Sequence, residues 1–440
     1  MDKELKTIYA GKETIIKIPE ANIMNVVSTH TAPILHNPEE KLKKLLENPI
    51  GGKKLVDIVK PGDKVALVSS EYTRMPFTWI LAPVVVDLLK KEGVKEKNIT
   101  LINAPGTHQT EEQQAENPLV KKLYGPLYGK YKMVLHDCDK RDTHTFVGYT
   151  SQGTPVWVNK AVAEADVTIG FGELAIHHAA GHCGGGKIIL PGVSARATIG
   201  SMHRRVMTQK SKYHEEWQQG AWGNDEKNEV RRDIEDAAEL AGLSFKIDTV
   251  TGRPGELLYD IFAGDFRKEF REGVKTQDKI HGTKIREKTD ICIYLSGQRG
   301  TTVSGSFLYA PFMADQATKD DGIVIQVVSA ENGWAGPGGG WFPPSRMVQS
   351  SEEMAWRLTG DIDMCSDLRN IALAWQVKRA LELKTTYMVT EYQNKELLQA
   401  LGMKYITNSF DEALAKALKE KGKDATITVL DQGGYILPPN

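Results

Sequence analysis

The 440-residue sequence predicts a protein of two α/β domains with an active-site cleft between them. Three observations predict this class. The chain is too long for one small hydrophobic core, and short apolar segments alternate with helix-like segments along it. Several of the apolar segments also run into loops that carry Gly, Thr or His. Ligands bind beyond the carboxyl ends of the strands in such sheets, so we expect a site at these loops.

The first part of the chain supplies most of the predicted strands. A hairpin is expected over residues 5–18, and a helix over residues 77–91. Thr107 is expected to cap a helix that contains EEQQAE. Further helices are predicted over EVRRDIEDAAELAG and GDFRKEFREGVKTQDKI. The other predicted strands of this part are VALVSS, NITLINA, KMVLHD, TPVWV, VTIGFG, KIILPG and SFKIDTVTG.

The predicted domain boundary lies in the hydrophilic segment HGTKIREKTD, which gives domains of residues 1–285 and 286–440. In the second domain the predicted strands are ICIYLS, GIVIQVVSA, TYMVTE, MKYITN and TITVLD. The loop ENGWAGPGGGWFPPS contains Trp334 and Trp341, and a loop of this length is typical of a lid or a binding loop. The sequence leaves open whether residues 423–440 pack back on the first domain.

Composition excludes several classes of function. The fractions of hydrophobic residues (40%) and charged residues (26%) are ordinary for a globular enzyme. A net charge of -1 gives no basic surface for nucleic acid or acidic membranes. The apolar run at 79–89 is shorter than the ~20 residues of a membrane span, and the first residues lack the apolar region of a secretory signal. The four scattered cysteines do not form a disulfide framework. We expect a cytoplasmic enzyme, and its oligomeric state stays open.

Reactive side chains are concentrated in residues 177–203, HHAAGHCGGGKIILPGVSARATIGSMH. GHCGGGK has the spacing of a phosphate-binding loop, but Ile188 stands where that loop needs Ser or Thr, and a strand rather than a helix is predicted there. The glycines favour close approach of the backbone to a ligand. Lys187 is then available as a covalent anchor for a carbonyl-type group. On this motif alone, a solvated lysine after a flexible turn is the alternative.

The histidines suit two kinds of chemistry. His178 and His182 are four residues apart, as two metal ligands on one helix face would be, but no Glu stands at the zinc-protease position. His177 and His108 fit general acid–base catalysis, because imidazole titrates near neutrality. His203 could bind a metal, and imidazole suits nickel, zinc or copper.

Arg74 has a planar fork suited to carboxylate or phosphate, and a salt bridge at a strand end is its alternative role. Arg74, His108 and His177 each follow a predicted strand. Because the carboxyl ends of such strands share one edge, these three side chains are expected at the same rim.

Together these motifs resemble one family, the nickel-dependent lactate racemases. Its pattern is a D-x-T-R-x-x-P turn, a G-T-H turn, a histidine ten residues before a lysine in a glycine-rich turn, then Pro-Gly and a second histidine. The matching residues are Glu71-Tyr72-Thr73-Arg74 with Pro76, Gly106-Thr107-His108, His177 with Gly184, Gly185 and Lys187, Pro191-Gly192, and His203. The resemblance extends over essentially the whole chain.

The resemblance implies a nickel-pincer nucleotide, a pyridinium-3-thioamide-5-thiocarboxylate mononucleotide that separate cofactor-synthesis enzymes make. It would be bound covalently to Lys187, with His203 as the protein ligand of nickel. His108 and His177 would alternate as base and acid on the substrate hydroxyl while the α-hydrogen leaves as hydride. Return of the hydride to the other face of the keto acid would invert the centre. The remaining cofactor-binding residues that the resemblance implies are Glu71, Thr73, Arg74, Gly184 and Gly185.

Two departures from the family pattern bear on the substrate. Glu71 replaces the family's aspartate, and it is expected to reach the sugar of the cofactor. The family's Tyr-Gln-x-x-Lys segment, whose lysine helps to hold the substrate carboxylate, aligns with residues 308–312, LYAPF, which contain no lysine. The predicted substrate is therefore a 2-hydroxy acid larger than lactate, such as a sugar acid or an aromatic acid. Its predicted contacts are Arg74, Gln298, Arg299, Tyr309, Trp334 and Trp341.

The sequence thus predicts an isomerase, a racemase or epimerase of a 2-hydroxy acid. Two alternatives belong to other classes. One is a zinc-type hydrolase or lyase that uses His178, His182 and His203, and the other is a protein that binds the cofactor without catalysis.

Overall fold

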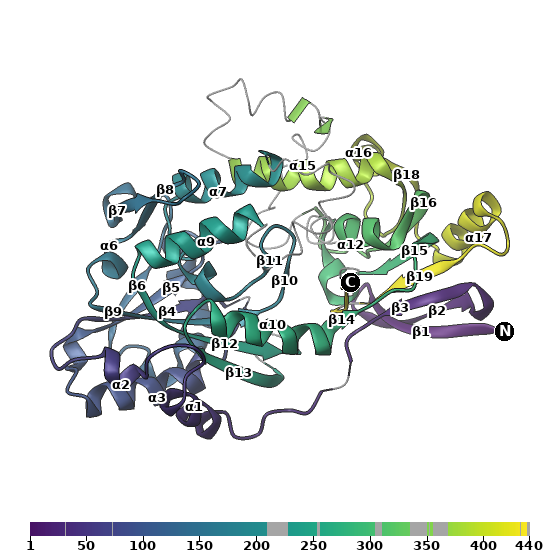
Figure 1. Ribbon diagram of the computed structural model, residues 1–440. Helices are drawn as coiled ribbons and strands as arrows, with labels where there is room; N and C mark the ends of the chain where they lie inside the picture. The colour runs from purple at the N-terminus through teal and green to yellow at the C-terminus, as the bar shows by residue number, and fades with distance from the viewer. Residues whose placement is uncertain are drawn as a thin grey trace. The chain divides into compact units, whose positions relative to one another are not determined.

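The chain folds into two compact units, each built on a six-stranded sheet with helices, in this computed structural model (Figure 1). The first unit comprises residues 31–205 and 209–277, and the second comprises residues 1–30, 206–208 and 278–440. The α/β class predicted from the sequence is confirmed. The structure describes residues 1–30, 32–72, 74–208, 228–252, 256–303, 310–334, 350–351, 353–354, 368–431 and 433–437.

The sheet of the first unit has the strand order β13-β12-β9-β4-β5-β6. All neighbours pair in parallel except β12 and β13, which are antiparallel. Its strands are β4 (Val65–Ser70), β5 (Ile99–Ala104), β6 (Lys132–Leu135), β9 (Val167–Leu174), β12 (Leu243–Thr251) and β13 (Leu258–Gly264). The sequence predicted all of them except β13. Parallel strands are covered on both faces, which explains why they read as continuous apolar runs.

The two faces of this sheet are covered by different helices. On one face α1 (Pro38–Glu47), α3 (Thr78–Lys91) and α5 (Pro118–Tyr124) pack into an apolar core with alternate residues of β9: Val167, Ile169 and Phe171. Burial of each such side chain contributes about 1.5–3 kcal/mol. On the other face, α9 (Glu229–Leu240) contacts β12 and the 3-10 turn η5 (Gly185–Ile188). In Figure 1, α1 and α3 lie below the sheet and α9 above it.

The remaining elements of the first unit are short connections and flanking helices. The helices α7 and α10 begin in this unit. Their bounds are α2 (Leu55–Ile58), α4 (Glu111–Glu116), α6 (Lys160–Ala163), α7 (Arg196–Thr208), α10 (Lys268–His281), η2 (Glu96–Asn98), η3 (Gly125–Leu127) and η4 (Arg141–Thr143), with the hairpins β7 (His144–Tyr149) and β8 (Pro155–Asn159), and β10 (Ile176–His177) and β11 (Gly181–His182).

Two local predictions for this unit were wrong. The segment KIILPG is not a strand: Gly184 has a φ of +100°, and η5 begins at the next residue. The buried run Ile188–Leu190 is apolar because it packs against the sheet, and a short apolar run cannot distinguish strand from helix by periodicity. The cap of α4 is Thr110 rather than Thr107. The Thr110 hydroxyl accepts a hydrogen bond from the Gln113 amide, and the Gln113 side chain accepts one from the Thr110 amide.

The sheet of the second unit is parallel throughout, in the order β18-β17-β16-β15-β19-β3. Apolar residues of these strands form a core with Ile16 and Ile18 of the N-terminal hairpin. The elements are β1 (Asp2–Tyr9), β2 (Lys12–Pro19), η1 (Glu20–Asn22), β3 (Ile23–Val27), β14 (Gly282–Thr283), β15 (Thr289–Leu295), η6 (Gly297–Thr301), α12 (Ala310–Ala317), β16 (Thr318–Val327), α15 (Leu368–Leu383), β17 (Thr385–Val389), α16 (Lys395–Leu401), β18 (Met403–Thr407), α17 (Phe410–Lys421), β19 (Ile427–Leu430) and β20 (Tyr435–Ile436).

The units differ from the domains expected on either side of residue 285. Residues 1–30 group with the C-terminal part of the chain because β3 pairs with β19. The C-terminal strands also stay in this unit: β19 lies between β15 and β3, and β20 pairs with β14. Sequence could not reveal these contacts, since they join residues far apart in the chain. The expected cleft between the domains stays a prediction.

No helix among the described residues is both long and apolar enough to cross a membrane.

Candidate active site

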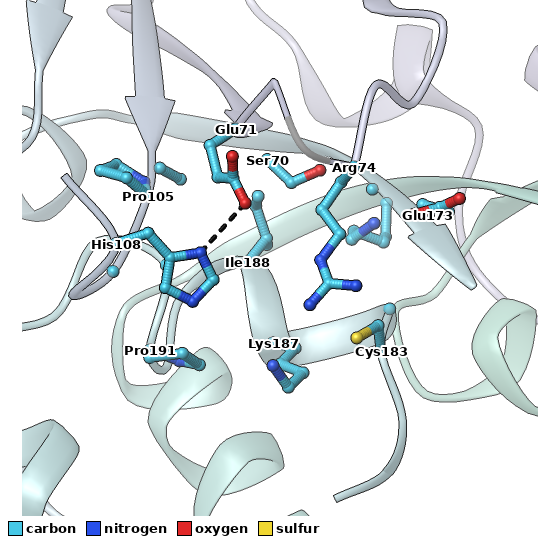
Figure 2. Close-up of a pocket in the computed structure, with 16 residues that line it drawn as sticks. Ser70, Glu71, Arg74, Pro105, His108, Glu173, Cys183, Lys187, Ile188 and Pro191 are labelled. Carbon is cyan, nitrogen blue, oxygen red and sulfur yellow. Dashed lines mark hydrogen bonds and ion pairs between the residues drawn. The ribbon is translucent and has the colours of Figure 1, made fainter. Parts of the chain in front are cut away.

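A pocket that is partly open to solvent lies where strands of the first unit's sheet end (Figure 2). The loops after β4 and β5, the end of β9, the glycine-rich turn and one side chain of β12 form its wall. The lining residues are Ser70, Glu71, Arg74, Ala104, Pro105, Gly106, His108, Gly172, Glu173, Cys183, Gly184, Lys187, Ile188, Pro191, Gly192 and Lys246. The predicted convergence of Arg74 and His108 at this edge is therefore observed, together with Lys187.

His108 is held by Glu71 across the pocket wall. Its Nδ1 lies 3.0 Å from Oε1 of Glu71, whose side chain is only 3% exposed (Figure 2). A carboxylate oxygen can only accept, so Nδ1 carries the hydrogen and Nε2 of the neutral ring is the basic nitrogen. Gly106 fixes this loop by donating its amide to the carbonyl of Gly192, 3.0 Å away. Glu71, expected on the cofactor's sugar, thus orients a histidine in this structure.

His177 has the opposite hydrogen-bond arrangement. It lies at the end of β10, and its Nδ1 accepts from the amides of Ala179 and Ala180, each 3.2 Å away. Nε2 therefore carries the hydrogen in the neutral ring. Burial, followed by the charges of Lys187 and other nearby groups, holds the pKa of His177 well below its usual 6.5, so the ring is neutral at neutral pH. His177 is not among the residues that line the pocket of Figure 2.

His203 lies on α7 and is buried. Its Nδ1 is 2.8 Å from the carbonyl oxygen of Ile199, one helical turn earlier. The carbonyl can only accept, so Nδ1 carries the hydrogen and Nε2 keeps the lone pair that a metal needs. A backbone hydrogen bond to the second ring nitrogen is the usual way in which proteins orient a metal-binding histidine.

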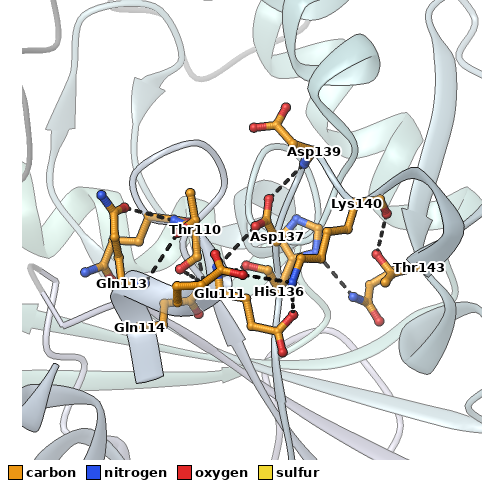
Figure 3. A network of polar contacts seen from close by, with 12 residues as sticks. Thr110, Glu111, Gln113, Gln114, His136, Asp137, Asp139, Lys140 and Thr143 are labelled. Atoms are coloured by element: carbon orange, nitrogen blue, oxygen red, sulfur yellow. Dashed lines mark hydrogen bonds and ion pairs between the residues drawn. The ribbon is translucent and has the colours of Figure 1, made fainter. Parts of the chain in front are cut away.

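A buried polar network holds the loops around the pocket (Figure 3). Gln114 accepts from the side chain of Asn103 at 2.9 Å and donates to the carbonyl of His136 at 2.8 Å. His136 donates through Nε2 to the carbonyl of Ser194 at 3.2 Å, and its Nδ1 is 3.3 Å from the side-chain nitrogen of Asn159. The network therefore ties β5 to the end of β6 and to the turn that follows Pro191. Burial lowers the pKa of His136 to about 3.

The metal-ligand pair suggested by the spacing of His178 and His182 does not form on a helix, because these residues lie at the tip and on the second strand of the β10–β11 hairpin. The ring of His178 stacks on that of His177 with centroids 4.3 Å apart. Among the described residues, the one group of three His, Cys, Asp or Glu side chains close enough to hold a metal is Asp137, Cys138 and Asp139.

That acidic group is already engaged. Asp137 accepts from the amides of Glu111 and Asp139, and the carboxylate of Asp139 accepts from Nε and Nη2 of Arg196. Burial also raises the pKa of the Cys138 thiol to about 12, which disfavours the thiolate that binds metals. Nothing in this group indicates a metal centre.

The other predicted site residues are distributed as follows. Thr73, Tyr309 and Trp341 lie outside the described residues, as do the side chains of Gln298 and Arg299. Trp334 is partly buried and packs against an apolar cluster of the second unit. Sequence reasoning missed Glu173 and Lys246 in the pocket wall. Glu173 follows the predicted strand VTIGFG, so its position at a strand end was the available signal.

Comparison with known proteins identifies the class of the chain. A model of the lactate racemase N-terminal domain matches residues 9–215, and one of the lactate racemase C-terminal domain matches residues 311–437, together about three quarters of the chain. The lactate racemase of Lactiplantibacillus plantarum is 25% identical over 404 residues, which is 90% of this chain and 89% of that protein. The lactate racemase of Thermoanaerobacterium thermosaccharolyticum is 26% identical over 438 residues, 98% of this chain and 97% of that protein.

Solved structures agree on the fold. The lactate racemase apoprotein of T. thermosaccharolyticum superposes with a TM-score of 0.83 at 22% identity, covering 99% of this chain and 100% of that one. A Thermotoga maritima protein superposes with a TM-score of 0.62 at 17% identity, covering 91% and 98%. The matches define an isomerase of the racemase class. The chain belongs to the lactate racemase family.

Proposed function

We propose that this protein inverts the α-carbon of a 2-hydroxy acid larger than lactate, with a nickel-pincer nucleotide bound covalently to Lys187. The observation that carries the proposal is the pocket in which the Glu71–His108 pair, Arg74 and Lys187 face the same space (Figure 2). A base, a carboxylate-binding cation and a nucleophilic amine are the groups that this chemistry requires from the protein.

The residues present fit this cofactor. Lys187 offers its amine at the pocket wall beside a glycine-rich turn, where the backbone leaves room for a ligand. The hydrogen bond from His203 to Ile199 leaves Nε2 in the form that binds nickel. Arg74 adds positive charge to the same wall, which suits a nucleotide phosphate. When bound, the cofactor supplies a reversible acceptor for the hydride of the substrate's α-carbon.

His108 and His177 are proposed to handle the proton of the substrate hydroxyl. Nε2 of His108 takes it, and the Glu71 carboxylate stabilises the imidazolium that forms. His177, neutral and with its hydrogen on Nε2, donates a hydrogen bond to the substrate oxygen. Arg74 binds the substrate carboxylate through its planar fork.

The size of the substrate is inferred from residues 308–312, which align with the family segment that helps to bind the carboxylate of lactate. These residues contain no lysine for that role. The assignment of its contacts to Gln298, Arg299, Tyr309, Trp334 and Trp341 stays a prediction. A screen of chiral 2-hydroxy acids that follows inversion of the α-carbon by chiral chromatography tests this inference. We expect sugar acids or aromatic acids to react fastest. A preference for lactate over every larger acid would overturn it.

The covalent link is tested by intact-protein and peptide mass spectrometry after co-expression with the cofactor-synthesis enzymes. We expect a mass increase at Lys187 together with bound nickel. Lys187→Arg is the matched control, since it keeps the positive charge but cannot form the link, and it should stay unmodified. An unmodified Lys187 in the wild-type protein under these conditions would count against the proposal.

The two alternative functions make different predictions. A zinc hydrolase would be active with zinc alone and without any adduct, and it needs His178, His182 and His203 as ligands. Those residues do not form a metal-sized group among the described residues, which favours the racemase. A non-catalytic cofactor carrier would keep its biological role when His108 and His177 are both changed to Ala, whereas the racemase would lose its turnover.

A further inference from the structure

Arg231 is a buried arginine whose donors point at backbone carbonyls of the segment between His177 and Lys187. It lies on α9 and is only 1% exposed. Its Nε and Nη2 donate to the carbonyl of Ala180 at 3.2 and 2.9 Å, and its Nη1 donates to that of Gly184 at 3.3 Å. Nη2 also contacts the carbonyl of His182. Burying an arginine costs free energy unless its donors are hydrogen-bonded. A site that buries one therefore uses several donors of its planar fork.

The opposite side of this segment is held by Asp248, which is fully buried on β12. Its Oδ2 accepts from the amide of Gly185 at 2.6 Å, while its Oδ1 pairs with Lys246. The packing is close: a Cβ on Gly184 would lie 2.7 Å from Oδ2 of Asp248. Residues 180–185 are therefore fixed from two sides, by donors from α9 and by an acceptor from β12.

These contacts end where the helical turn that carries Lys187 begins. The carbonyl of Gly184 accepts from Arg231 and also from the amide of Lys187, 3.2 Å away. Neither Arg231 nor Asp248 is among the residues that line the pocket. Arg231 therefore acts on the site through this backbone, whereas Asp248 also reaches the pocket wall through its pair with Lys246. We call residues 180–187 the anchor turn.

We propose that Arg231 and Asp248 are positioning residues that fix the anchor turn so that the Lys187 amine faces the pocket. The inference rests on the proposed function in one respect, the role of Lys187 as the covalent anchor. The planar fork of arginine reaches three carbonyls at once, which the single ammonium of a lysine cannot do. Without the fork, the turn loses its fixed geometry and the amine samples several directions.

The first measurement uses the protein without cofactor. Lysines are labelled with limiting acetic anhydride at several pH values, and the labelling rate of Lys187 is read by peptide mass spectrometry. We expect Arg231→Lys and Arg231→Met to change this rate at least threefold and to shift its pH midpoint. Exposed lysines elsewhere, such as Lys132, should label as in the wild type. Arg232→Lys and Arg232→Met are the matched controls, because Arg232 is the next residue on α9 and is exposed.

The second measurement is the fraction of Lys187 modified after co-expression with the cofactor-synthesis enzymes. We expect at least a tenfold loss in the Arg231 variants and none in the Arg232 controls. If Arg231→Met does not fold, the proposal is tested with Arg231→Lys and Asp248→Asn instead. Circular dichroism checks that each variant is folded. The proposal would be overturned if Lys187 of folded Arg231 and Asp248 variants were labelled at the wild-type rate and modified by the cofactor to the wild-type extent. Changed labelling together with an unmodified wild-type Lys187 would instead refute the covalent anchor and leave the positioning role standing.

Discussion

At the scale of single residues, the two candidate catalytic histidines differ in which ring nitrogen is basic. A carboxylate acceptor fixes the hydrogen of His108 on Nδ1, whereas two amide donors fix that of His177 on Nε2. At neutral pH the ring of His108 is therefore able to take a proton, and the ring of His177 is able to donate a hydrogen bond. The difference arises from neighbours, Glu71 in one case and the backbone of a hairpin in the other.

Glu71→Gln tests the first of these arrangements. Loss of the carboxylate removes the charge that stabilises the imidazolium, so the pKa of His108 should fall and the acid limb of kcat/KM should move to lower pH. We expect kcat/KM near neutrality to drop by about 10²–10³-fold. The measurement is the pH–rate profile of the cofactor-loaded enzyme on its best substrate.

Glu71→Asp is the control for that experiment, because it restores the family's aspartate and keeps the charge. It should retain most of the activity and the position of the acid limb. An acid limb that does not move in Glu71→Gln, or equal losses in both variants, would contradict the role assigned to the pair.

At the scale of elements, the cap of α4 distinguishes two threonines three residues apart. Thr110 makes the capping box with Gln113, while Thr107 lies in the loop before it. Thr110→Ala should lower the free energy of unfolding by about 1 kcal/mol, and Thr107→Ala should leave it nearly unchanged. Urea unfolding of both variants measures this. A larger loss at Thr107 than at Thr110 would show that the cap has been misassigned.

Helices and strands could be predicted where burial of the element determines which of its residues are apolar. VALVSS and VTIGFG were recognised because strands covered on both faces are apolar throughout. The same rule misled at KIILPG, where an apolar run is buried around a 3-10 turn. The strand β3 was missed because the polar residue Asn25 stands in its middle and interrupts the apolar run.

The site was predictable in its strand-end residues but not in its supporting ones. Arg74 and His108 follow strands that the sequence identifies, so their convergence could be inferred from sheet geometry. Arg231 and Asp248 could not be inferred, because their partners are backbone atoms of a turn whose shape depends on two glycines. The tautomers of His108 and His177 depend on contacts that no spacing encodes.

At the scale of the whole molecule, buried histidines make stability depend on pH. The folded pKa of His136 is about 3, below the ordinary value near 6.5. Between these values the unfolded chain binds a proton that the folded chain does not, so the free energy of unfolding falls as pH falls. The lowered pKa of His177 acts in the same direction. Each such group contributes a slope of up to about 1.4 kcal/mol per pH unit.

His136→Gln isolates one of these contributions, since Gln can keep a donor for Ser194 and an acceptor for Asn159. Urea unfolding between pH 7 and pH 5 should show that the variant loses about 1 kcal/mol per pH unit less than the wild type. His36→Gln, at an exposed histidine, is the control. Parallel pH curves for wild type and His136→Gln would contradict the assignment.

The pairing of β3 with β19 has a consequence for biosynthesis. The N-terminal hairpin and β3 are synthesised before residues 31–277, yet β19, the strand that pairs with β3, follows only about 400 residues later. At roughly 5–20 residues per second, this segment waits for tens of seconds with its edge exposed. Residues 31–277 can complete their own sheet meanwhile. The unit that contains residues 1–30 therefore completes its sheet last. Nascent-chain truncations before residue 427 should therefore leave residues 1–30 sensitive to protease while the first unit is already protected.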